Sequence, residues 1–345
     1  MSARRTSVTA REVAEKAGVA VSTVGRALAD DPRVSQLTKD RVRDAAAQLN
    51  YAGNLPARMM RGGESNLVGL IIPDLRNPFY ATVMQVLNAT ANRFGYRLVL
   101  AVTDDDSDTE ARHVRDLVGA RVSGVIIVPT ASPTPESVRL LTTVPHVQLL
   151  RRNAAFADRW FGIDDEVALR TATEHVIGLG HRRIAYIGGD TGISTAAARL
   201  RGFRGALAAA RGSVDGIEHI GPPSIAFGGA TLRHLLACDT PPTAIIAGAD
   251  AITLGMIEVI EQLGVAVPGD VSIVGFGDAT WLSWWHGGLT TVHVKPEELA
   301  TECGDWFFDG LRNRQLVPGP GECQSVTVQT ALVVRRTTAP RSKLE

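Results

Sequence analysis

The chain has 345 residues, of which 45% are hydrophobic and 21% charged, and its Lys+Arg and Asp+Glu counts are equal at 36. This length predicts two or three domains, and the composition is typical of a soluble globular protein. No stretch approaches the roughly 18 apolar residues of a membrane span, and the start, MSARRTSVTAREV, lacks the apolar core of a signal peptide. The cysteines Cys238, Cys303 and Cys323 are far apart, without metal-type spacing. We therefore expect a cytoplasmic protein without a membrane partner or a bound metal.

Charge is distributed unevenly along the chain. Residues 1–62 contain eleven Lys or Arg and six Asp or Glu, which leaves 25 basic and 30 acidic residues in the remainder. A basic N-terminal part before an acidic body suggests that this part binds a polyanion, although chance also produces such an imbalance.

Three helices are predicted before residue 50. Thr9 and Glu12 have the spacing of a capping box, Gly18 interrupts the first helical pattern, and a second helix follows over residues 21–28. A third helix begins after Ser35 or Thr38, and its apolar stripe consists of Val42, Ala45, Ala46 and Leu49.

Small and apolar residues at Ala14, Gly18 and Val24 indicate a helix-turn-helix, although an ordinary helical hairpin has the same pattern. In a helix-turn-helix, the N-terminal side chains of the second helix face base edges in the major groove. The predicted base contacts are Val21, Ser22, Thr23 and Arg26. Thr9 and Thr38, at helix starts, are predicted to contact phosphates.

A linker with helical potential follows. Pro56 suits the first turn of a short helix, which the pair Gly62 and Gly63 would end. We therefore predict a DNA-binding head over residues 1–49, a linker over 50–63 and a third region over 64–340.

Strands and helices alternate from residue 67 onward. This alternation builds doubly wound parallel sheets, and the number of strands predicts two Rossmann-like lobes of the periplasmic-binding-protein type. The predicted strands are Leu67–Ile72, Arg97–Val102, 124–128, 147–150, 183–187, Ala244–Ala247 and 271–274.

Polar residues follow most of these strands, and ligands of open α/β sheets bind beyond the carboxyl ends of strands. We predict that several of them line one cleft between the lobes, although each alone also fits a loop or a helix cap. The predicted cleft residues of this kind are Asp74, Thr130, Arg151, Asp250 and Asp278. Phe79 and Trp281 offer flat apolar faces to a ligand, or else belong to the core or a lobe contact.

Many segments resemble the LacI/GalR (lactose-repressor) family in fixed order across nearly the whole chain. They include VTAREVAEKAGVAVSTVGRAL from Val8, LVGLIIPDLRNPFYATV (67–83), LGHRRIAYIGG (179–189), PPTAIIAGAD (241–250) and VPGDVSIVGFGD (267–278). The resemblance implies a homodimeric transcriptional regulator, a repressor by expectation, whose affinity for operator DNA depends on a sugar-like effector bound between the lobes. It implies no cofactor.

The resemblance also implies roles for individual residues. Val21, Ser22 and Arg26 match base-reading positions, and residues 54–61 match a hinge helix that orders on DNA. Within that hinge, Asn54 belongs to the DNA-binding set, Ala57 allows close helix pairing and Met60 wedges into the minor groove. Asp74, Arg199 and Asp250 match effector-contacting positions, where a carboxylate accepts hydroxyl hydrogen bonds and an arginine donates them.

Three departures from the family pattern stand out. Ala20 replaces a usual serine before the second helix, and Gly25 replaces a usual serine within it, so this helix loses a cap and stiffness. Gly277 replaces a common aspartate near the cleft. We therefore expect operator binding to depend strongly on dimer pairing and Met60, and we do not transfer the identity of the effector from relatives.

Two other functions are weighed against this one. An exported solute-binding protein shares the two-lobe fold, but it requires a signal peptide and leaves residues 9–61 without a role. An enzyme on the same scaffold requires a catalytic motif, and the sequence shows no nucleophile elbow, metal-ligand spacing or phosphate loop. His181, within LGHRRI, is expected to form hydrogen bonds between elements. We therefore predict that the chain is not an enzyme.

Overall fold

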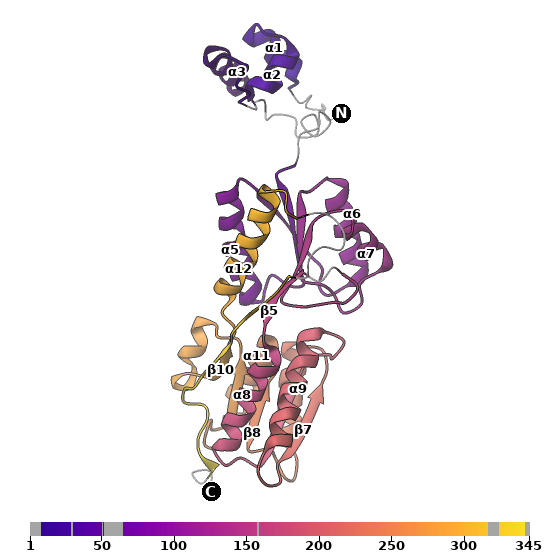
Figure 1. Ribbon diagram of the computed structural model, residues 1–345. Helices are drawn as coiled ribbons and strands as arrows, with labels where there is room; N and C mark the ends of the chain where they lie inside the picture. Colours follow the sequence, from indigo (N-terminus) through magenta and orange to yellow (C-terminus); the bar gives the residue numbers. More distant parts are fainter. Residues whose placement is uncertain are drawn as a thin grey trace, which may run out of the picture. The chain divides into compact units, whose positions relative to one another are not determined.

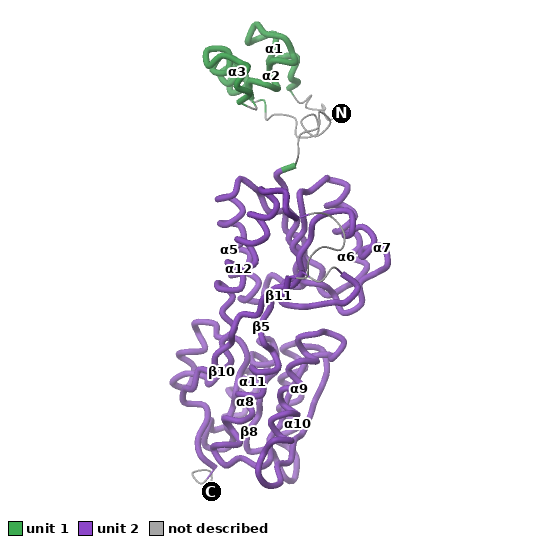
Figure 2. The backbone as a smooth tube through the Cα atoms, viewed as in Figure 1, with its two compact units in different colours: residues 1–65 green, residues 66–345 purple. Residues whose placement is uncertain are grey.

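The computed structural model describes residues 8–28, 30–49, 51, 65–156, 159–316 and 324–341. The chain divides into two compact units, residues 1–65 and 66–345 (Figures 1 and 2). Among the described residues, no helix is long and apolar enough to cross a membrane.

The first unit contains helices α1 (Ala10–Ala17), α2 (Val21–Leu28) and α3 (Gln36–Gln48). The predicted capping box is confirmed, since the Thr9 side chain accepts from the Glu12 amide and the Glu12 side chain accepts from the Thr9 amide. Ser35, not Thr38, is the N-cap of α3. The core of the three helices consists of Val13, Ala14, Ala17, Val24, Ala27, Val42, Ala45 and Ala46.

The second unit begins with a lobe built on a six-stranded parallel sheet. The strands lie in the order β11 (Gln324–Val328), β5 (Arg159–Ile163), β4 (His146–Leu149), β3 (Gly124–Ile127), β1 (Leu67–Ile72) and β2 (Arg97–Val102). One face is covered by α5 (Pro78–Phe94) and α12 (Pro296–Arg312), and the other by α6 (Ser107–Gly119) and α7 (Pro135–Leu141) (Figure 1).

The other lobe has a second six-stranded sheet. Its order is β12 (Ala331–Val333), β10 (Thr290–His293), β9 (Ser272–Phe276), β8 (Ala244–Ala247), β6 (Arg183–Gly188) and β7 (Asp215–Ile220), and β12 alone is antiparallel to its neighbour. One face carries α8 (Asp165–Gly178) and α9 (Ser194–Ala209), and the other carries α10 (Ile225–Leu236) and α11 (Asp250–Leu263). Two short 3₁₀ helices, Thr280–Ser283 and Trp285–Gly287, follow β9.

The chain passes between the lobes three times: from β5 to α8, from β10 to α12 and from β11 to β12. One cluster of buried apolar side chains includes residues of both lobes, such as Val68 on β1 and Ile184 on β6. The two lobes therefore belong to one compact unit.

The predicted fold class is confirmed: a helical head and two Rossmann-like lobes. All seven predicted strands exist, and their bounds differ from the prediction by at most two residues. Five strands were not predicted, namely β5, β7, β10, β11 and β12. His181 forms the expected hydrogen bonds between elements, to Thr243 Oγ1 at 2.9 Å and the Ala339 carbonyl at 3.1 Å.

Candidate DNA-binding face and effector cavity

Helix α2 buries one face and exposes the other. Val24 and Ala27 are buried in the head core, which fixes the helix against α1 and α3. Val21, Ser22 and Arg26 are exposed, and the half-buried Thr23 lies beside them. Because positions four apart lie on the same side of a helix, Ser22 and Arg26 share one exposed face.

The turn before α2 depends on a glycine. Gly18 ends α1 in the left-handed conformation at φ 62°, and its amide donates to the carbonyls of Ala14 and Glu15. A Cβ atom there would lie 2.9 Å from Arg41 Nη2, which donates to the Ala17 carbonyl at 2.5 Å. A side chain at position 18 would therefore strain the backbone and disturb the contact of α3 with the turn.

The two threonines predicted to contact phosphates take part in helix caps. Thr9 is exposed, and its hydroxyl lies 2.9 Å from Glu12 Oε2. The Thr38 hydroxyl lies 2.8 Å from Ser35 Oγ. The first amides of both helices remain the natural donors to an anion. Asn54, Ala57 and Met60 lie outside the described residues.

A cavity of about 840 Å³ lies between the two lobes. Its lining comes from β-strand ends and helix starts of both lobes, and most of it is apolar. Six of the eight predicted effector residues line it: Asp74, Phe79, Arg151, Arg199, Asp250 and Trp281. The carboxyl ends of the strands therefore meet around one cavity, as in other open α/β sheets.

The other two predicted residues, Thr130 and Asp278, are not part of this lining. Thr130 is buried, and its amide donates to the Glu110 carboxylate at 2.8 Å. Arg335 holds both oxygens of Asp278 at 2.8 and 3.0 Å. Both residues have protein partners that account for their polarity.

The Arg199 side chain is part of the cavity lining. Its Nε donates to Asp165 Oδ1 at 2.6 Å, and its Nη1 donates to the Gly248 carbonyl at 2.8 Å. Its Cζ lies 3.7 Å from the centre of the Phe276 ring, a cation–π geometry. Burial raises the pKa of the Asp165 carboxyl, against the opposing charge of Arg199.

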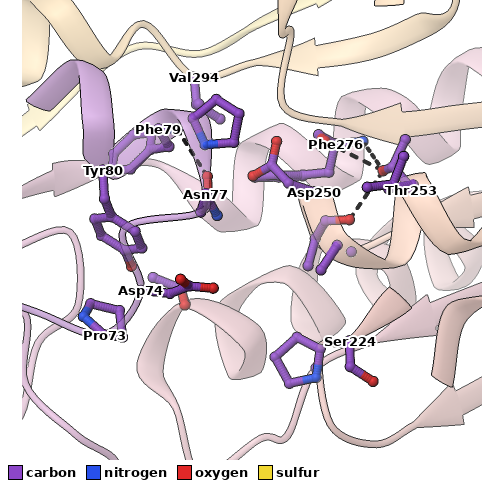
Figure 3. A pocket seen from close by; sticks show the side chains of 18 of the residues that line it. Pro73, Asp74, Asn77, Phe79, Tyr80, Ser224, Asp250, Thr253, Phe276 and Val294 are labelled. Atoms are coloured by element: carbon purple, nitrogen blue, oxygen red, sulfur yellow. Dashed lines mark hydrogen bonds between the residues drawn. The ribbon is translucent and has the colours of Figure 1, made fainter. Parts of the chain in front are cut away.

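Asp250, the first residue of α11, lies in the cavity wall beside Asn77 (Figure 3). Burial raises the pKa of its carboxyl to about 6, although the Arg199 charge and an Asn77 hydrogen bond both lower it. The carboxylate fits because residue 277 is a glycine, with φ 84°: a Cβ atom there would lie 1.6 Å from Asp250 Oδ1.

A second arginine on the wall is also paired. Arg151 holds both oxygens of Asp105, and the Nη2–Oδ2 distance is 3.1 Å. The backbone on both sides of this pair is left-handed, at Leu150 (φ 62°) and Asp105 (φ 60°). At the cavity edge, Asp74 Oδ1 accepts from Arg76 Nε at 3.0 Å, and the Arg76 side chain is 85% exposed.

Sequence reasoning missed several lining residues, among them Asn77, Tyr80, Ser224 and Phe276. Asn77 is the N-cap of α5, and its side chain accepts from the Phe79 amide at 2.9 Å. The Asn77–Pro78 pair is a recognisable helix start, so the sequence contained a clue to this position. Nothing in the sequence separated Tyr80 and Phe276 from ordinary core residues.

Two family profiles match the chain. "Bacterial regulatory proteins, lacI family" matches residues 9–54, and "Periplasmic binding protein-like domain" matches residues 173–338. The ribose operon repressor of Escherichia coli (strain K12) is 32% identical over 315 residues, which cover 90% of this chain and 94% of that protein. The chain belongs to the lacI family of bacterial regulatory proteins.

Other lacI-family relatives agree. The HTH-type transcriptional regulator GalR of E. coli (strain K12) is 28% identical over 310 residues, covering 89% of this chain and 90% of that protein. The crystal structure of the Lac repressor dimer bound to operator and the anti-inducer ONPF superposes with a TM-score of 0.81 at 27% identity, covering 97% of this chain and all of that one. A complex of the regulator CelR with cellobiose has a TM-score of 0.70 at 27% identity, covering 96% and 100%. The chain is thus a DNA-binding transcriptional regulator and not an enzyme.

The departures from the lacI-family pattern have visible structural consequences. Helix α2 begins without a side-chain cap, because residue 20 is alanine. The backbone carbonyl of Ala20 accepts hydrogen bonds from the amides of Thr23 and Val24. Gly277 leaves the space that the Asp250 carboxylate fills. One departure affects the DNA-binding face, and the other affects the cavity.

Proposed function

We propose that this protein is a sequence-specific transcriptional repressor that acts as a homodimer and whose operator affinity is set by a small, sugar-like effector. The observation that carries this proposal is the combination, in one lacI-family chain, of a helix with an exposed polar face and a two-lobe unit that encloses a cavity. We further propose the domain limits 1–49, 50–63 and 64–340.

Helix α2 is the proposed reader of the operator. Ser22 can donate to or accept from several bases, Val21 suits a thymine methyl, and Arg26 suits guanine. Thr23 supplements these contacts, while Thr9 and Thr38 hold phosphates at helix starts. Asn54, Ala57 and Met60 complete the DNA-binding set in the hinge.

The proposed effector site is the cavity with its residues Asp74, Phe79, Arg151, Arg199, Asp250 and Trp281. Thr130 and Asp278 lie outside the lining, where Glu110 and Arg335 are their partners. Cellobiose in the CelR complex and the ribose repressor among the relatives support a sugar-like effector. Lobe movement about the three chain crossings would couple effector binding to DNA affinity, because a ligand that contacts both lobes prefers one arrangement of them.

Two surfaces support pairing of the two-lobe unit. The edge strand β2 exposes Val99 and Leu100, each at 37%. In the other lobe, Trp284 is 73% exposed. Apolar groups on a sheet edge favour association with another chain.

A DNA selection tests this function. Full-length protein is incubated with a pool of random duplexes, and bound DNA is enriched and sequenced. We expect a near-palindromic site with two half-sites. Replacement of Arg26 by Ala should weaken binding to that site by about 1–3 kcal/mol and relax the preference for one base. The control is Arg43→Ala on α3, an exposed arginine paired with Asp30 and Asp40, which should leave the base preference unchanged. Failure to enrich any sequence would refute the proposal.

A further inference from the structure

The carboxylates that line the cavity differ in their partners. Asp250 has no basic partner of its own among the described residues: its hydrogen bonds come from the Asn77 side chain and its own amide. The charge of Arg199 lowers the pKa of the Asp250 carboxyl, but Asp165 already accepts from Arg199 at 2.6 Å. An arginine keeps its proton in a protein, so this pair is neutral when Asp165 is ionised.

The other charges on the wall cancel. Arg151 is bound by Asp105 and Arg76 by Asp74, so each of these pairs is neutral as well. The described lining contains three aspartates and three arginines, but Arg199 is paired with Asp165, which lies outside the lining. Asp250 is therefore the one carboxylate of the described lining that has no arginine partner. A buried charge without a counter-ion is costly, and a ligand of opposite charge removes that cost.

The surroundings of Asp250 suit an organic cation. Phe79, Tyr80 and Trp281 line the same cavity (Figure 3 shows the first two). Aromatic faces attract cations that are held by a carboxylate. Burial raises the pKa of the Tyr80 hydroxyl, so Tyr80 offers a neutral aromatic ring.

The cavity is unfavourable for anionic ligands. Every lining guanidinium has a carboxylate partner, so a phosphate would have to displace an aspartate from its arginine and lie near Asp250. Both steps cost free energy.

We propose that the effector carries a positively charged amino group that binds Asp250, on a ring that packs against the aromatic wall, and that phosphorylated ligands are excluded. This inference rests on the proposed function and specifies the chemical class of its effector: an amino sugar or another ring-bearing amine. Gly277 is the specificity-determining neighbour, because only a residue without a side chain leaves room for the carboxylate.

Matched ligands that differ in charge test the proposal. The probes are glucosamine, glucose and glucose 6-phosphate; galactosamine, galactose and galactose 6-phosphate; and tyramine with its alcohol analogue 4-hydroxyphenylethanol. The melting temperature of the full-length protein and the dissociation constant are measured near neutral pH for each. In at least one set we expect the amine to bind about tenfold or more tightly than its neutral analogue, with no stabilisation by phosphates.

The variant Asp250→Asn keeps the shape of the side chain and removes its charge. It should lose the preference for the amine, while Asp108→Asn, an exposed aspartate in the first turn of α6, should keep it. Tighter binding of a neutral or phosphorylated member, no stabilisation by any of the amines, or an unchanged preference in Asp250→Asn would each overturn the inference. If a neutral sugar binds most tightly and alters DNA affinity, the inference fails but the proposed function stands. If the protein shows no sequence-selective DNA binding, the proposed function itself fails.

Discussion

At the scale of single residues, the ionised Asp250 side chain in the cavity lowers the stability of the folded protein. Its carboxyl has a pKa of about 6 in the folded protein and an ordinary value of 3.8. The folded state therefore holds its proton more tightly than the unfolded state. This aspartate consequently costs nothing below about pH 4. It lowers the free energy of unfolding progressively as the pH rises from about 4 to about 6, and the loss levels off above that.

The first prediction concerns the direction of the Asp250 pKa shift. Asp250→Asn should raise the free energy of unfolding of the ligand-free protein near pH 7.5 by up to about 3 kcal/mol, an upper limit because water in the cavity solvates the carboxylate. The gain should disappear near pH 4. Urea unfolding of both proteins at the two pH values measures it, and equal stability near pH 7.5 would contradict the prediction.

The second prediction concerns Gly277. Gly277→Ala should lower the free energy of unfolding by about 2–4 kcal/mol, because the new methyl group strikes Asp250 and the backbone is left-handed. Gly95→Ala is the matched control: its φ is 82°, but nothing lies within 4 Å of the new Cβ atom. The control isolates backbone strain, so an equal loss in both variants would show that contact with Asp250 is unimportant.

Some residues that line the cavity could be predicted from the sequence, but their partners could not. Asp250 was predicted from its place after a strand and from the family resemblance, Arg199 from the resemblance alone, and both line the cavity. Their partners were not predictable in the same way. Asp165 lies 34 positions from Arg199, and the closeness of Gly277 to Asp250 is a property of the folded loops alone.

At the scale of elements, α2 is the weak part of the head. Its first turn has no side-chain acceptor for its free amides, since residue 20 is alanine. The third prediction is that Ala20→Ser stabilises the head by about 1 kcal/mol. Thermal unfolding of the full chain, followed through the head transition, measures this effect. Ala47→Ser, on the exposed side of α3, should give no gain, and stabilisation by both serines would argue against a capping effect.

The strands that were not predicted differ in sequence from those that were. Buried strands such as β1 and β8 are continuous apolar runs that stand out in sequence. Strand β7, DGIEHI, is an edge strand with a largely exposed, polar sequence. Strands β11 and β12 are short or half-exposed, and they belong to different sheets although only two residues separate them. Their pairing depends on distant segments, which a local pattern does not contain.

At the scale of the whole molecule, the exposed β2 edge makes association testable. The fourth prediction is that Val99→Asp weakens dimerisation at least about tenfold, because a charge would lie on a dry apolar edge. Sedimentation of dilute full-length protein measures the monomer–dimer equilibrium. Ile220→Asp is the control, since Ile220 is 39% exposed on β7, an edge strand of the other sheet. An unchanged dimer in Val99→Asp would place the interface elsewhere.

The three crossings between the lobes also determine the order in which the chain can fold during its synthesis. The helices of the head are contiguous, so they can pack as soon as residue 49 is available. The first lobe, by contrast, needs α12 and its edge strand β11, which ends at Val328, and the second needs β12, which ends at Val333. Neither sheet can be completed until more than nine-tenths of the protein has been made. A ribosome stalled midway would therefore present a finished DNA-binding head attached to two unfinished lobes with exposed sheet edges.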